Sequence, residues 1–166
     1  MIFTEPRDPR FITIRRGGTL TDDNHRLLAV WAATCAEHVL PLFETARPGD
    51  DRVRHALAQN RAWVRGELTM RQALNASSAR AAARDTSGAP KFVAYAAAQA
   101  VAVAHVAAHE LGAAAYAIRA VQAASGEQAG RDECQWQRQQ LPIEIRDLVL
   151  DDQRLRNHAC WFVFDC

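Results

Sequence analysis

The most regular hydrophobic pattern in this chain of 166 residues runs from Phe92 to Val121. Nearly half of that span is alanine, and only Glu110 and Arg119 are charged. Two stripes of residues recur at helical steps of three and four. One is aliphatic: Val93, Ala96, Ala100, Val103, Ala107, Leu111, Ala114, Ile118 and Val121. The other is mixed: Tyr95, Gln99, Ala102, His105, His109, Ala113 and Tyr116. A helix that is apolar on two sides has neighbours on both, so this span predicts a buried central helix.

The length of this central element predicts an interruption. A continuous helix from Pro90 to Ala124 would be about 50 Å long. A compact domain of this size has a diameter of about 40 Å. We therefore expect a break or sharp kink near Leu111-Gly112, with Phe92 to Ala108 buried at the centre of the domain.

Start and stop signals divide the rest of the chain into further helices. Thr21 is typical of an N-cap, and Pro41 predicts a kink at about Glu37. The remaining signals predict helices that begin at Asp50 and end at Gly66, begin at the capping box of Thr69 and Gln72 and end at about Arg84, run from about Glu127 to Gln140, and run from Pro142 through Leu150.

The two ends of the chain look different from the helical middle. Residues 1–20 predict an extended arm, because Arg10 to Arg16 alternate apolar and polar residues before Gly17-Gly18. Residues 158–166 predict an extended tail that packs on the core, since Cys160 to Phe164 are too aromatic to remain in water, and it could pair with Phe11 to Ile14.

Composition agrees with a single all-α domain over residues 1–166. Hydrophobic residues make up 49% of the chain and aromatic residues only 7%, so alanine, the best helix former, supplies much of the apolar total. The expected fold is a compact multi-helix domain around the alanine-rich central helix, with short extended N- and C-terminal segments.

Charge and cysteine usage restrict the partners and the compartment. The net charge of +1 argues against nucleic acid, which needs a basic surface. Phe92 to Ala108 is too weakly apolar to predict a membrane span. The start, MIFTEPRDPR, lacks the apolar core of a signal peptide. Because the four cysteines show no C-x-x-C spacing, free thiols in a reducing cytoplasm are expected.

His105 and His109 are the candidates for chemistry. On one continuous helix, two histidines four residues apart share a face and can both reach a metal ion, with His38 or His55 as a third ligand. The spacing does not match the H-E-x-x-H motif, since Glu110 follows the second histidine. The alternative is that both histidines hydrogen-bond within a buried polar seam. No catalytic, cofactor or metal residue is therefore assigned. His105 and His109 are metal ligands only in the alternative hypothesis of a metal-dependent enzyme.

A run of polar residues around Trp136 is a second candidate, this time for partner binding. Tryptophan and arginine are common at binding hot spots, and Trp136 and Arg138 lie close together in sequence. The alternative for this run is a helix with Trp136 in the core and a polar outer face.

Several phrases of the chain resemble one protein family. They are Arg26 to Ala33, Cys35 to Glu44 (CAEHVLPLFE), Ala100 to Val106 with His109, Gly112 to Ala114, Tyr116-Ala117, Trp136-Gln137 and Gln140 to Pro142. Together they resemble the immunity proteins of bacterial polymorphic toxin systems, in the Imm-five-like group, over roughly Thr21 to Val149. The resemblance implies an all-α fold and protection of a bacterium from a toxin, without catalysis.

Two functions follow as hypotheses. The first is a non-enzymatic, cytoplasmic immunity protein that neutralises a cognate toxin domain by stoichiometric binding, with no cofactor. The alternative is a metal-dependent helical-bundle enzyme that uses His105 and His109. A toxin gene immediately upstream would favour the first hypothesis, and metal in the purified protein would favour the second.

Overall fold

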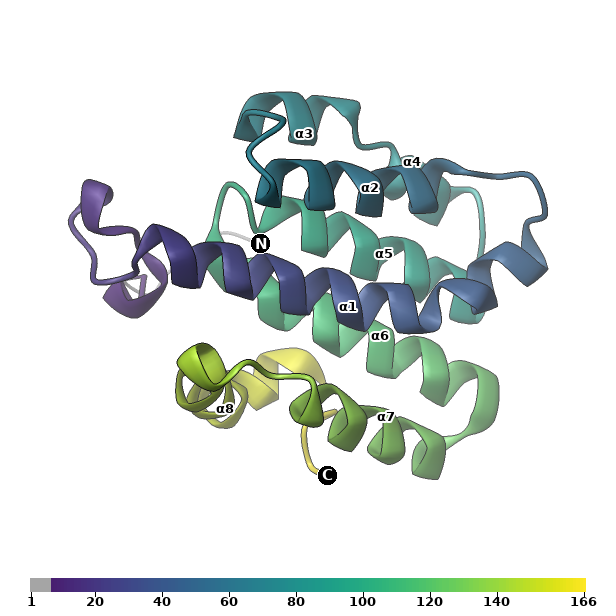
Figure 1. Cartoon of the computed structure of the whole chain (residues 1–166). Coiled ribbons are helices and arrows are strands. Elements are labelled where there is room, and N and C mark those ends of the chain that lie inside the picture. The colour runs from purple at the N-terminus through teal and green to yellow at the C-terminus, as the bar shows by residue number, and fades with distance from the viewer. Residues whose placement is uncertain (1–6) are drawn as a thin grey trace.

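The computed structural model describes residues 7–166 as an all-α protein (Figure 1). Its helices are α1 (Asp22–Ala46), α2 (Arg52–Val64), α3 (Met70–Ala76), α4 (Ala79–Arg84), α5 (Gly88–Ala102), α6 (Glu110–Ser125), α7 (Glu127–Gln139) and α8 (Ile143–Arg156). Short 3-10 helices occupy Pro9–Phe11, Ile14–Arg16, Ala107–His109 and Asn157–Cys160. The expected all-α class is confirmed.

Helices α5 and α6 form an antiparallel pair at the centre of the molecule (Figure 1). The long helix α1 packs against both of them, and α2 and α4 cover α5 on the side away from α6. Helix α7 packs on α6, and α8 with the C-terminal segment completes the lower layer in this view. The alanine-rich pair is thus enclosed because small side chains let four other helices approach it closely.

Burial of the central segment is confirmed. Most side chains from Phe92 to Ala108 are buried or half-buried, and Val93, Ala100 and Val103 are fully buried. His105 is the exposed exception. Helix α1 has the length and composition of a membrane-spanning helix. However, its large apolar residues Trp31 and Phe43 are buried inside the protein, as in the core helix of a globular domain.

The start signals of two helices are confirmed. The Thr21 hydroxyl accepts a hydrogen bond from the Asn24 amide at 3.1 Å. Thr69 and Gln72 form the full capping box of α3. Helix α1 continues through Pro41 to Ala46. The single helix expected from Thr69 to Arg84 is wrong, because the chain is non-helical at Ser77 and Ser78 and starts again as α4.

The expected break in the central element exists, but its position was wrong. The interruption lies at residues 103–109, and Gly112 is inside α6. A Cβ atom at Gly112 would lie 2.7 Å from the side-chain oxygen of Gln99 on α5. Glycine at this position therefore allows close packing of the two helices and does not end a helix.

Side chains from other helices stabilise the end of α5. His25 of α1 places Nε2 2.6 Å from the carbonyl oxygen of Val103, and Asn60 of α2 donates from Nδ2 to the carbonyl oxygen of Ala100 at 2.7 Å. The last carbonyls of a helix have no partner within the helix and need one elsewhere when they are buried. These two contacts supply partners for carbonyl oxygens at the end of α5.

Both chain ends are tighter than the expected extended segments. Residues 7–20 of the expected N-terminal arm contain two 3-10 turns, with one isolated β-bridge between Thr13 and Leu20 among residues 7–166, and residues 1–6 of that arm lie outside the described residues. The C-terminal segment forms a 3-10 helix followed by turns. Phe164 is buried, but Trp161 and Phe162 are exposed, so the expectation that the whole aromatic tail packs inward was wrong.

A disulfide ties the chain end to α7. Cys134 and Cys166 are bonded, with their Cα atoms 6.2 Å apart, whereas Cys35 and Cys160 are free and buried. The expectation of four free thiols was therefore wrong, because residues 32 positions apart meet when the C-terminal segment folds back onto α7. The argument for a reducing compartment depended on four free thiols, so it no longer holds.

Candidate functional site

The structure separates the two histidines that spacing had placed on one helix face. His105 lies in the turn after α5, is exposed, and has Nδ1 3.3 Å from the sulfur of Met70. His109 lies in the following 3-10 helix and is half-buried, and its Nδ1 donates to Gln99 Oε1 at 2.7 Å. Since Val106 between them is extended, the shared helical face is not formed. The expectation that both histidines lie on a continuous buried helix was wrong.

The other histidines have separate environments. His38 of α1 lies with Nδ1 2.7 Å from Glu133 Oε2 and stacks on Trp136, and His55 of α2 contacts Gln59 within its own helix. Among residues 7–166, no three His, Cys, Asp or Glu side chains are grouped as metal ligands would be. The structure therefore does not bring His38 or His55 together with the pair at 105 and 109.

Trp136 was predicted either to bind a partner or to lie in the core, and its position is intermediate between the two. It is half-buried and its ring stacks on His38 with the ring centroids 3.5 Å apart. The neighbouring Gln137 is fully buried and donates to Glu133 Oε1, while its own carbonyl accepts a hydrogen bond from the Trp31 indole at 2.9 Å. This run thus ties α7 to α1 and leaves only part of one tryptophan ring exposed.

The most strongly perturbed carboxyl group is inaccessible. Glu110, at the start of α6, is fully buried, and neither of its side-chain oxygens has a hydrogen-bond partner. Burial and then the negative charge of Asp152 raise the pKa of Glu110 well above its ordinary value, while Arg156 opposes the rise from 3.6 Å. Perturbed groups often mark functional sites. Here no described cleft reaches the carboxyl group, so its contacts serve to join α6 to α8.

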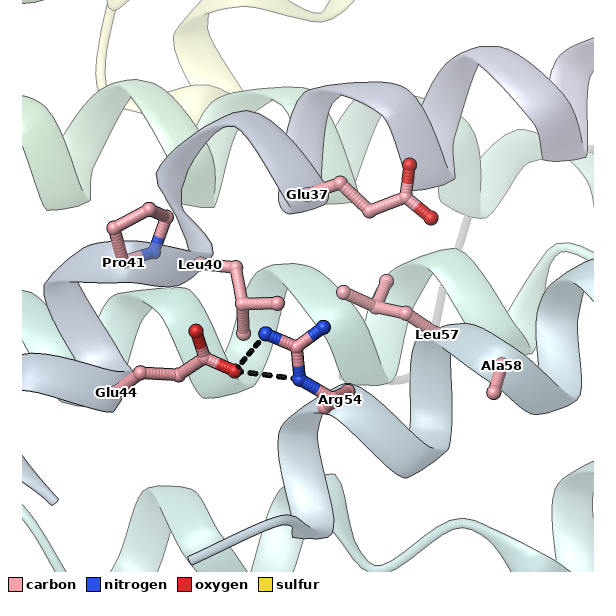
Figure 2. Close-up of a pocket in the computed structure, with 7 residues that line it drawn as sticks. All are labelled: Glu37, Leu40, Pro41, Glu44, Arg54, Leu57 and Ala58. Carbon is pink, nitrogen blue, oxygen red and sulfur yellow. Dashed lines mark hydrogen bonds and ion pairs between the residues drawn. The ribbon is translucent and has the colours of Figure 1, made fainter. Parts of the chain in front are cut away.

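A cleft between α1 and α2 has a volume of about 420 Å³ and is lined by Glu37, Leu40, Pro41, Glu44, Arg54, Leu57 and Ala58 (Figure 2). Figure 2 shows Arg54 pointing toward Glu44, with which it forms an ion pair. Glu37 is bonded by Arg61 at 2.6 Å. Both carboxylates of the cleft are therefore already paired with arginines, and the described residues that line the cleft leave no unpaired charge with which to bind a charged ligand.

A second cleft, of about 330 Å³, lies beside the C-terminal segment. Arg138 reaches into this region and donates to the carbonyl oxygens of Phe164 at 2.8 Å and Cys166 at 3.3 Å. Burial lowers the pKa of Arg138 from its ordinary value. Together with the disulfide, these hydrogen bonds hold the chain end in place, which is a structural task.

A partly exposed group of aromatic and arginine side chains lies where α5, α6 and the C-terminal turn meet. We call it the aromatic–arginine surface, and it comprises Phe92, Tyr95, Tyr116, Arg119, Trp161 and Phe162. The guanidinium carbon of Arg119 lies 4.8 Å from the ring centroid of Phe92 and 4.7 Å from that of Trp161. Trp161 is 49% exposed and Phe162 61% exposed. Tryptophan, tyrosine and arginine are the residues enriched at protein-binding hot spots.

Sequence reasoning missed this surface because its parts are distant in the chain. Tyr95 and Tyr116 were visible in the second stripe of the central element, and Trp161 and Phe162 in the aromatic tail. The stripe alone predicted packing, and the tail alone predicted burial. Only the fold of the chain end over α6, which brings the rings of Trp161 and Tyr116 to 5.2 Å, shows that they form one surface.

Comparison with known proteins identifies a family. A family model described as "Imm-5 like putative immunity protein" matches residues 18–144. No curated protein and no solved structure matches significantly. The match extends over α1 to α7 and therefore includes Phe92, Tyr95, Tyr116 and Arg119, whereas Trp161 and Phe162 lie beyond it.

Proposed function

Because this chain belongs to the Imm-5 like immunity protein family, we propose that it neutralises a cognate bacterial toxin by binding the toxin domain in a one-to-one complex. Membership of the family carries the general role of immunity. The proposal adds the mechanism, namely that the protein occupies a surface of the toxin and transforms no substrate.

The accessibility of the polar groups supports binding over catalysis. A general acid or base must reach its substrate within hydrogen-bond distance. Glu110, whose pKa is strongly raised, is fully buried, and His109, whose pKa burial lowers to about 4, is bonded to Gln99. The carboxylates of the cleft in Figure 2 are paired with arginines.

One observation carries the proposal beyond the family match: aromatic and arginine side chains are partly exposed on helices that are themselves packed in the core. Arg119 and Tyr116 belong to α6, which also carries the fully buried Leu111 and Ile118. A binding surface on such a support loses little conformational freedom when a partner docks.

The test uses the toxin domain that the proposal requires, which is sought in the gene immediately upstream. The purified toxin is titrated with the immunity protein while its activity is followed. Binding as proposed gives complete inhibition at an equimolar ratio and a one-to-one complex on size exclusion with light scattering. Inhibition by a small fraction of an equivalent would indicate catalytic removal of the toxin or its product, and the proposal would then fail.

A further inference from the structure

We propose that the aromatic–arginine surface is the docking site for the toxin, and that it recognises an acidic patch on the toxin domain. This inference rests on the proposed function and adds the location of the interface and the chemistry of the partner. It is carried by the charge distribution of helices α3 to α6 and by the arrangement of Arg119, Trp161 and Phe162.

Helices α3 to α6 carry more basic than acidic residues although the whole chain is nearly neutral. From α3 to α6 the basic residues are Arg71, Arg80, Arg84, Lys91 and Arg119. The acidic residues in the same stretch are Asp85 and Glu110. Asp85 forms an ion pair with Arg52 of α2 at 2.7 Å, and Glu110 is fully buried beside Arg156. Neither carboxylate therefore neutralises the outside of these helices.

Arg119 lies against the aromatic rings, and the charge of Arg80 acts on Tyr116. Burial, followed by the neighbouring Tyr95, raises the pKa of Tyr116, and the charges of Arg119 and Arg80 act in the opposite direction. Within residues 7–166 neither arginine has an ion-pair partner, in contrast to Arg61 with Glu37 and Arg131 with Glu127. A carboxylate of a docking protein would supply the missing charge.

Arg119 is already oriented for such a contact. Its guanidinium lies over the rings of both Phe92 and Trp161, and these contacts restrict its motion. A stacked guanidinium loses less side-chain freedom when it binds a carboxylate than a free one does.

The C-terminal turn holds two large apolar rings in water, and one of them, Trp161, lies against this arginine. Trp161 and Phe162 have φ angles of 56° and 58°, a left-handed conformation that non-glycine residues rarely adopt. Hydrogen bonds keep the turn in this form: the Phe162 amide donates to the Asn157 carbonyl oxygen at 3.0 Å, and the Phe164 amide to Asn157 Oδ1 at 3.1 Å. The Cys134–Cys166 disulfide closes the segment behind them. Residues held in such sparsely populated backbone conformations cluster at functional sites.

The aromatic–arginine surface is suited to bind a protein surface that combines carboxylates with an apolar depression. A single-stranded nucleic acid also stacks on aromatic rings. However, nucleic-acid binding relies on many phosphate contacts, and a chain of net charge +1 provides few. We therefore propose a protein partner, and the experiment below also measures whether the surface binds nucleic acid.

The experiment measures binding of a catalytically disabled form of the neighbouring toxin domain to wild-type protein and to matched pairs of variants. Arg119→Glu is compared with Arg131→Glu, a half-exposed arginine of α7. Trp161→Ala is compared with Leu155→Ala, an apolar residue of α8 that is 45% exposed. Phe162→Ser provides a variant whose exposed side chain contributes little to folding, and thermal unfolding confirms that each protein is folded.

We expect Arg119→Glu and Trp161→Ala to raise Kd by about 30-fold or more, as at hot spots, and both controls to stay within about threefold of wild type. The association rate of the wild type should fall with increasing salt, and this dependence should weaken in Arg119→Glu. Phe162→Ser should raise Kd by about tenfold.

The remaining outcomes overturn the inference in distinguishable ways. If the wild type binds the toxin and all five variants bind equally well, the docking site lies elsewhere and only the proposed function survives. If the wild type does not bind the toxin, the proposed function fails together with the inference. If toxin binding is unchanged in Arg119→Glu but binding of single-stranded oligothymidylate is lost, the surface recognises nucleic acid and the inference is wrong.

Discussion

The imidazole of His25 on α1 donates a hydrogen bond from Nε2 to the carbonyl oxygen of Val103, 78 residues away, at a distance of 2.6 Å. Since a carbonyl can only accept, this nitrogen carries the proton. Burial lowers the pKa of His25, so the neutral ring makes this contact. The bond caps α5 where the central element turns.

Replacing His25 by alanine should destabilise the fold. The substitution leaves the buried Val103 carbonyl without a partner, and an unsatisfied buried group costs about 1–3 kcal/mol. Chemical denaturation should show a loss of this size, with His55→Ala as the control because His55 is exposed and bonds only within α2. Equal losses in the two variants would show that the Val103 contact contributes nothing to stability.

Glu110 predicts a stability that declines toward alkaline pH. Its pKa is raised in the folded protein, so the folded state holds the proton more tightly than the unfolded chain. The stabilisation associated with this proton is complete below the unfolded pKa of about 4.5 and is lost as pH rises toward the folded value.

Glu110→Gln should remove this pH dependence, because glutamine keeps the shape of the protonated acid. Relative to the wild type, the variant should gain stability as pH rises from 5 to about 9, as measured by urea unfolding at several pH values. Glu144→Gln, which removes an exposed carboxylate of α8, is the control. A constant difference between Glu110→Gln and the wild type across this range would refute a raised pKa.

His109 acts in the opposite direction. Burial, followed by the charge of Arg80, lowers the pKa of His109 from 6.5 to about 4. Folding therefore favours the neutral ring, and the corresponding stabilisation is present above pH 6.5 and is lost as pH falls from 6.5 to about 4.

In His109→Gln this acid-side loss should be smaller than in the wild type. The readout is the difference in unfolding free energy between the two proteins at pH 7 and at pH 4.5, and it should shrink at the lower pH. His158→Gln, at an exposed position in the C-terminal segment, provides the comparison. A difference that stays the same at both pH values would contradict the lowered pKa.

Breaking the disulfide should loosen the C-terminal segment. A bond that closes a loop of 32 residues stabilises a protein by about 3–4 kcal/mol in the chain-entropy description. Cys134→Ser should lower the free energy of unfolding by up to this amount, and a reductant should lower that of the wild type equally. The reductant should have no effect on Cys134→Ser. If wild-type stability is insensitive to reductant, the bond contributes nothing.

Local signals in the sequence were enough for the helical content and several helix ends. Thr21 and the Thr69–Gln72 box act within four residues of themselves, so their hydrogen bonds could be predicted from spacing. The burial of Phe92 to Ala108 followed from a pattern that is apolar on two sides.

The break between α5 and α6 could not be placed in this way, because distant residues determine it. The sequence around His25 and Asn60 does not indicate that these residues contact α5. In the structure, however, both form hydrogen bonds with the carbonyls where α5 ends. Gly112 signalled a break by its identity, although its function is to admit the side chain of Gln99. The histidine pair then lost its common face when the helix ended before it.

The candidate site required the fold for the same reason. Each ring of the aromatic–arginine surface had a plausible position in the core when its own segment was considered alone. Trp161 reaches Arg119 only because the C-terminal segment folds back over α6. Neither the hydrophobic periodicity nor the cysteine spacing predicted this arrangement of the segment.

The most direct test of the account is the inhibition titration of the toxin domain with wild-type protein beside Arg119→Glu. Stoichiometric neutralisation through the aromatic–arginine surface predicts that toxin activity falls linearly to zero at one equivalent of wild type. The Arg119→Glu variant, folded to the same degree, should need a large excess to reach the same inhibition. Complete inhibition by far less than one equivalent of wild type would contradict the binding mechanism, and identical curves for the two proteins would contradict the assigned surface.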